Sequence, residues 1–134
     1  MKLKSVLSIV FVSSIILVLL TGMSVFEKWE VPEEYKTMKN PFVGQPDPDG
    51  IGADLWKTHC ASCHGKTGNG DGKKADELES ELDDFAEEEV QAQSDGVLFY
   101  KSFIGRDEMP NFEKKITDNE DRWMLINYIR QFAE

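Results

Sequence analysis

Cysteine and histidine are scarce in this chain, which has 134 residues and only two of each. The two cysteines are three positions apart, and a disulfide across so short a loop would be strained and would constrain almost no chain. Strand-like alternation of polar and apolar residues is also missing, and no segment repeats. These absences exclude a disulfide scaffold and disfavour a thioredoxin-like βαβ fold, which leaves an all-α domain as the expectation.

Basic residues are few relative to acidic ones. The chain carries 15 Lys and Arg against 25 Asp and Glu. All of the acids and 13 of the bases follow Phe26, so the sequence after that residue has a formal charge of −12. A surface of this sign repels nucleic-acid phosphates, and we expect no nucleic-acid partner. It favours solubility and steered encounters with basic patches on other proteins.

The first 26 residues contain no acidic residue and only two basic ones, Lys2 and Lys4. From Val6 to Phe26 the sequence is apolar apart from a few Ser, Thr and Gly residues. As a helix, such a segment spans the roughly 30 Å of bilayer hydrocarbon. We therefore expect residues 1–26 to form a single transmembrane anchor, with a cleaved signal peptide as the alternative. Retention of Lys2 and Lys4 in the cytoplasm would place the rest of the chain on the outer, periplasmic side of the cytoplasmic membrane.

Proline is concentrated directly after this segment. Four of the five prolines lie between residues 27 and 50. Proline fixes φ and removes a hydrogen-bond donor, so this composition favours turns and extended chain. We predict a linker over residues 27–50 and one globular domain over residues 51–134.

Helical patterns account for the predicted domain. Apolar spacing predicts helices over 54–63 and 96–104, and a terminal helix capped by Thr117 or Asp118. Residues 76–89 carry nine carboxylates and no base, with their few apolar residues at helix-like spacing, so we expect a solvated helix there. Short helices of this kind offer a thin core, and small domains usually need a disulfide, a metal or a cofactor.

Both cysteines belong to the sequence Cys60-Ala61-Ser62-Cys63-His64, which has the spacing of a c-type haem attachment motif. Thiols three residues apart on a helical turn can each add to one vinyl group of a porphyrin, and His64 is then placed to ligate the iron. A structural zinc site needs four ligands in a tetrahedron. The only candidates nearby are Cys60, Cys63, His64 and His59, which are too close together in the sequence to surround one ion. We predict one covalent haem c on Cys60 and Cys63, with His64 bound to its iron and His59 facing solvent.

A methionine is the expected ligand on the other side of the iron, because a thioether raises the reduction potential. Met109 lies in a predicted loop 45 residues after His64, and Pro110 stiffens the chain behind it. Met124 falls within the terminal helix, where a methionine is more often core filler. Met38 lies in the predicted linker. We predict Met109 as the second axial ligand, with Met124 or no methionine as alternatives.

From about Gly52 to Phe132 the chain resembles class I bacterial cytochromes c. The resemblance rests on a haem motif, a glycine loop, a distal ligand loop and a terminal helix, at residues 60–65, 68–72, 109–112 and 121–130. In that family a glycine and an aromatic residue on the first helix cross a large residue and an aromatic residue on the last. The matching positions here are Gly52, Trp56, Leu125 and Tyr128. The acidic stretch over 76–89 departs from the family, in which more Pro and apolar residues are expected.

The resemblance implies the small all-α cytochrome c fold around one haem, with iron held by His64 and Met109 and no open coordination position. Such a site transfers single electrons and does not activate oxygen or peroxide. We expect an electron carrier, not an enzyme, that serves respiratory partners at the outer face of the membrane. Two alternatives stay open: a haem-bearing subunit of a larger respiratory complex, and a peroxidase-like or ligand-sensing haem domain with a weak or absent Met109 bond.

Overall fold

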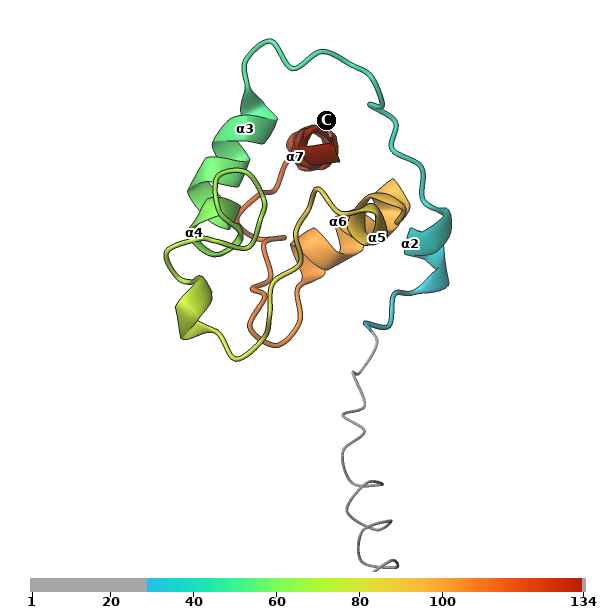
Figure 1. Ribbon diagram of the computed structural model, residues 1–134. Helices are drawn as coiled ribbons and strands as arrows, with labels where there is room; N and C mark the ends of the chain where they lie inside the picture. The colour runs from blue at the N-terminus through green and yellow to red at the C-terminus, as the bar shows by residue number, and fades with distance from the viewer. Residues whose placement is uncertain (1–28, 134) are drawn as a thin grey trace, which may run out of the picture. The chain divides into compact units, whose positions relative to one another are not determined.

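The computed structural model describes residues 29–133, which are helical and contain no β-strand. The predicted all-α fold is therefore confirmed for this part of the chain. The predicted transmembrane helix over residues 1–26 lies outside the described residues, and no helix within 29–133 is long and apolar enough to cross a membrane. Figure 1 shows the elements in chain order: α2 (Glu33–Thr37), α3 (Ile51–Leu55), a π-helical turn (Trp56–Cys60), α4 (Ala61–His64), a 3-10 turn (Ala75–Glu77), α5 (Glu88–Gln91), α6 (Asp95–Ile104), α7 (Asn119–Arg130) and a final 3-10 turn (Gln131–Ala133).

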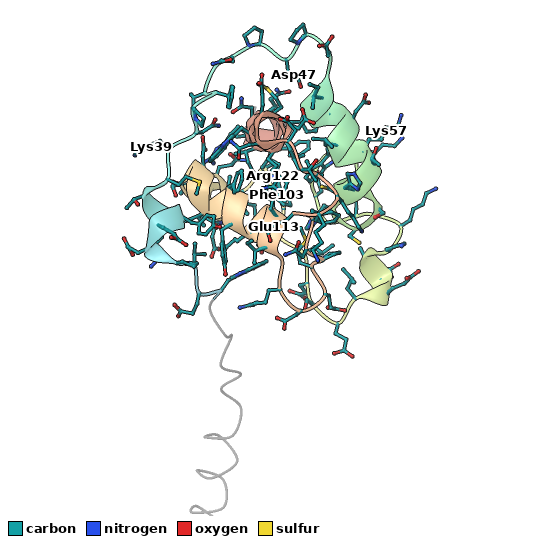
Figure 2. All side chains as sticks on the ribbon, turned by 180° about the vertical axis from the view of Figure 1, so that it is seen from behind. Lys39, Asp47, Lys57, Phe103, Glu113 and Arg122 are labelled. Atoms are coloured by element: carbon teal, nitrogen blue, oxygen red, sulfur yellow. The ribbon has the colours of Figure 1, made fainter. Side chains whose placement is uncertain are left out.

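The first long helix is continuous from Ile51 to His64, because α3, the π-helical turn and α4 follow one another without a break. It begins three residues before the predicted start at residue 54. The cause is Asp47, whose carboxylate accepts the amide protons of Ile51 (2.9 Å) and Gly52 (2.8 Å) and so caps the first turn. Figure 2 labels Asp47 at this end of the helix.

Helix α7 lies between α3 and α6 and packs on both (Figure 1). The close crossing with α3 occurs at Gly52, where an added Cβ would lie 2.9 Å from Cβ of Tyr128 and would strike the Met124 carbonyl. The crossing expected from the resemblance is present. The most deeply buried side chains of the unit come from α6 and α7, namely Phe103, Leu125, Ile126 and Ile129.

The boundaries of α6 and α7 follow the predicted caps. The Ser94 hydroxyl accepts the Val97 amide at the start of α6, and Gly105 ends that helix at a φ of 71°. The Asp118 carboxylate accepts the amides of Glu120 and Asp121 at the start of α7. Of the two predicted caps for the terminal helix, Asp118 is therefore the one used.

Residues 31–50 pack on the helices and do not form a free linker; we call them the strap. Their helix α2 lies beside α6 (Figure 1), where the rings of Tyr35 and Tyr100 have centroids 4.7 Å apart. The compact unit accordingly begins at Val31, well before the predicted boundary at residue 51.

Polar contacts hold the second half of the strap. The Asn40 amide donates to Asp95 on α6 at 3.1 Å and to Asn127 on α7 at 2.8 Å. Gly96 permits this close approach, because a Cβ there would lie 2.8 Å from Cβ of Met38 and would strike a carbonyl of α2. Each of these contacts joins residues far apart in the sequence, which is why the local composition of the strap did not predict them.

The prediction of a long solvated helix over residues 76–89 is wrong. The structure has a single 3-10 turn at its start, irregular chain from Leu78 to Glu87 and the short helix α5. Like charges three or four residues apart destabilise a helix, and this stretch has no base to offset them. The segment is held instead by contacts at separate points, such as the bond from the Phe85 amide to the Gly68 carbonyl at 2.8 Å.

Candidate functional site

The Cys-x-x-Cys-His motif occupies the C-terminal end of the first long helix. Cys60 ends the π-helical turn and is 8% exposed, whereas Cys63 and His64 on α4 are half-buried. No disulfide joins the two cysteines. Burial, with a smaller effect from Cys63, raises the pKa of Cys60 to about 12, which keeps this sulfur protonated. The helix thus brings two thiols and an imidazole together at one end.

A glycine-rich loop satisfies the carbonyl end of this helix. The last carbonyls of a helix have no donors within it. Three successive ones here accept loop amides: Ser62 O from Lys74 at 2.8 Å, Cys63 O from Gly72 at 3.0 Å, and His64 O from Gly70 at 3.0 Å. A side chain at Gly72 would strike the Cys63 carbonyl, so glycine is needed for this approach. The loop fixes the backbone that carries the motif.

His64 lies among aromatic rings, with its ring centroid 5.0 Å from Phe85 and 5.9 Å from Trp56. The Trp56 indole donates to the Gly65 carbonyl at 3.0 Å, which ties the residue after His64 to the helix. Nδ1 of His64 is buried and has no hydrogen-bond partner, a state that no other buried side-chain nitrogen or oxygen shares within residues 29–133. Burial lowers the pKa of His64, although Asp83 opposes this effect. The neutral imidazole is the form that ligates metals.

Sequence reasoning missed two aromatic rings that pack on Trp56, the neighbour of His64. Phe85 and Phe132 have centroids 5.3 Å and 4.7 Å from that of Trp56. Both side chains pack on Gly68, where an added Cβ would lie 3.0 Å from Cδ2 of Phe132 and from Cβ of Phe85. The available signal was that Phe85 is the single aromatic residue of the acidic stretch.

Met109 lies in a tight turn after α6. The Arg106 amide donates to the Met109 carbonyl at 2.9 Å, and the Met109 amide donates to the Arg106 carbonyl at 2.8 Å. Asp107 within the turn has a φ of 52°, a left-handed conformation that Asp tolerates better than most residues. A side chain at Gly105 would strike the Met109 carbonyl. The Met109 side chain is half-buried and packs on the hydrophobic cluster that also contains Cys60.

Arg122 of α7 secures the chain that follows the turn, and Figure 2 shows it beside Phe103 and Glu113. Its Nε donates to the Ile116 carbonyl and its Nη2 to the Glu113 carbonyl, both at 2.7 Å. Its guanidinium lies 5.4 Å from the Phe103 ring centroid. In addition, the Phe112 amide donates to the Phe103 carbonyl at 2.9 Å. Both sides of the Met109 turn are therefore attached to helices.

The other candidate residues are placed differently. Met124 is 5% exposed within α7, as expected of core filler. Met38 lies in the strap and packs on the core. His59 was expected to face solvent, but it is half-buried, with its ring 5.6 Å from that of Phe112.

These residues fit a covalent haem. The site has two thiols on one helix end, a neutral imidazole beside them with an uncommitted buried nitrogen, and a methionine in a braced loop. Within the described chain, no three His, Cys, Asp or Glu side chains gather as a set that could hold a metal ion. The zinc alternative therefore has no support from the structure.

A helical fold of this kind with a Cys-x-x-Cys-His motif at the end of its first helix defines a c-type cytochrome. The family model described as cytochrome C oxidase, cbb3-type, subunit III matches residues 49–129, more than half of the chain, and the chain belongs to this family. No curated protein matches. A cytochrome c domain implies haem c with its iron and a role in haem-based electron transfer.

Proposed function

We propose that this chain is a mono-haem cytochrome of class I that is anchored in the cytoplasmic membrane and carries one electron at a time between respiratory partners. Cys60 and Cys63 would form the two thioether bonds, and His64 and Met109 would ligate the iron. The chain has one Cys-x-x-Cys-His motif, which supports a single haem. When bound, the haem supplies an iron that alternates between two oxidation states.

The observation that carries the proposal is the state of His64. Burial lowers the pKa of its half-buried imidazole, which favours the neutral form, and its buried Nδ1 has no partner, so the ring is free to ligate iron at the end of the helix that presents both thiols. Met109 also supports the proposal, because it is held in the turn after α6 that two backbone hydrogen bonds close. Two axial protein ligands leave no position for oxygen or peroxide, which favours a carrier over an enzyme.

The surroundings proposed for the haem domain follow from the sequence. Residues 1–26 would span the membrane, with Lys2 and Lys4 in the cytoplasm and the domain on the outer, periplasmic face. The formal charge of −12 after Phe26 favours redox partners with basic docking surfaces.

A second candidate is a haem-bearing subunit of a larger respiratory complex. The family description, which names subunit III of a cbb3-type oxidase, favours it. Purification of the native protein from membranes under mild detergent separates the two: a subunit stays with the other chains of the complex, whereas a carrier is recovered alone.

The mass of the polypeptide after denaturation and extraction with acidified solvent tests the haem proposal. We expect the mass of the chain plus one haem, and a bare-chain mass would refute the proposal. A weak far-red band in the oxidised spectrum, which is typical of methionine bound to ferric haem, is the expected sign of Met109 ligation.

A further inference from the structure

A carboxylate next to the proposed methionine ligand binds a backbone segment from another part of the chain. Glu108 Oε1 accepts the Glu79 amide at 3.0 Å, and Oε2 accepts the amides of Glu79 and Ser80 at 3.1 and 3.0 Å. These bonds lower the pKa of the Glu108 carboxyl. The contact places a further negative charge beside the acidic stretch, whose side-chain carboxylates repel it. The attraction comes from the backbone amides, which donate hydrogen bonds to the carboxylate.

Glu108 and Met109 are adjacent residues of one turn, so a contact that fixes Glu108 also affects the position of Met109. Glu108 lies inside the turn that is closed by the two hydrogen bonds between Arg106 and Met109. Because these two bonds close a turn of four residues, Glu108 cannot shift far without displacing Met109. The position of the Glu108 carboxylate therefore restricts that of Met109.

The segment that Glu108 binds is connected at its other end to His64. Leu82 packs on Gly70, where an added Cβ would lie 3.1 Å from Cβ of Leu82. The Gly70 amide in turn donates to the His64 carbonyl at 3.0 Å. Residues 78–82 line an open depression of about 430 Å³ at the surface, so close packing does not hold the segment along its length.

We propose that Glu108 is a positioning residue for Met109: its bonds to the amides of Glu79 and Ser80 connect the methionine turn to the segment attached to the His64 loop. The inference rests on the proposed ligation by His64 and Met109. Glu108 does not touch the iron; it limits how far the methionine turn can move away from the histidine side of the site. The other contacts described around the turn run to α6, to Arg122 and to the hydrophobic cluster, and none of these reaches the segment at Glu79 and Ser80.

Substitution of Glu108 tests the proposal in the full-length haem-loaded protein. Glu108→Ala removes both acceptors, and Glu108→Gln keeps one uncharged carbonyl oxygen as acceptor and replaces the other oxygen with an NH2 group that cannot accept. Glu81→Gln is the matched control, because it removes one charge from the same segment at an exposed side chain with no hydrogen bond among the described residues. The readouts are the intensity of the far-red band and the affinity of the ferric protein for imidazole, which competes with methionine for iron.

We expect Glu108→Ala to weaken the far-red band and to raise the affinity for imidazole roughly fivefold, in line with the loss of charge-assisted hydrogen bonds at an exposed site. Glu108→Gln should give a smaller change, and Glu81→Gln should match the unmodified protein. Equal behaviour of Glu108→Ala and Glu81→Gln would overturn the positioning role and leave methionine ligation intact. Absence of the band in the unmodified protein would refute methionine ligation itself, and the positioning role with it.

Discussion

Replacement of Gly52 by alanine tests the helix crossing that supports the haem motif. Two opposing effects decide the result. Alanine is favoured over glycine within a helix by about 1 kcal/mol, so propensity alone would stabilise the variant. The new Cβ would, however, strike the Met124 carbonyl and lie 2.9 Å from Cβ of Tyr128. A backbone carbonyl cannot rotate away as a flexible side chain would, so α3 and α7 must separate.

Overpacking of this kind typically costs about 1–3 kcal/mol. Because the contact here is with backbone, we place the cost at the upper end and expect a net loss of about 1–2 kcal/mol from the free energy of unfolding. For a domain of this size, that corresponds to a fall in Tm of about 5–15 °C. Ala53→Gly in the same helix is the control for propensity and should cost about 1 kcal/mol without any steric effect.

Urea unfolding followed by far-UV circular dichroism measures both variants. A Gly52→Ala protein that is as stable as the unmodified one, or more stable, would show that the helices do not meet at this residue. The same outcome would show that contact at Gly52 does not support the helix end that carries Cys60, Cys63 and His64. Changes of equal size and opposite sign, a gain in Gly52→Ala and a loss in Ala53→Gly, would show that only helix propensity is at work.

Three further predictions concern the ligand, the strap and the charge. Met109→Ala should open the iron to carbon monoxide and lower the reduction potential, whereas Met124→Leu should change neither, and exchanged behaviours would refute the ligand assignment. Gly96→Leu should displace the strap and speed tryptic cleavage at positions 36 and 39 severalfold with an unchanged haem spectrum; unchanged cleavage would mean that the strap does not depend on this contact. Electron transfer to the natural acceptor should slow steeply as salt rises, because screening shortens charge steering to about 8 Å at physiological ionic strength. Neutralising the three glutamates at 87–89 should weaken that dependence, and a rate indifferent to salt would exclude steering.

The sequence predicted correctly those parts of the structure that depend on interactions between residues close together in the chain. Ser94 and Asp118 cap helices through bonds to amides two or three residues away, so the sequence around them contains the whole interaction. The haem motif is local in the same sense, because its residues share one helix end. The strap is the opposite case: Asn40 binds Asp95 and Asn127, which are 55 and 87 positions away. No local pattern encodes a partner at that distance.

The acidic stretch shows how a local pattern can mislead. Its apolar residues have helical spacing, but Leu82 packs on Gly70, and the ring of Phe85 packs on His64. These two contacts lie on the glycine loop and the haem motif, and the intervening chain extends to reach both. The spacing identified Leu82 and Phe85, which do pack on the domain, but the helical backbone inferred from it was wrong.

The docked strap determines how much free chain remains between the haem domain and a membrane anchor. A free linker over residues 27–50 would allow the domain to range up to about 85 Å from the bilayer at full extension. With the strap docked from Val31 onward, residues 31–50 no longer contribute to that reach. If residues 1–26 anchor the chain as proposed, the docked strap would keep the haem domain nearer the membrane than a free linker would. Its local concentration toward a membrane-embedded acceptor would then be higher, and a soluble partner would have to come to the membrane to exchange an electron.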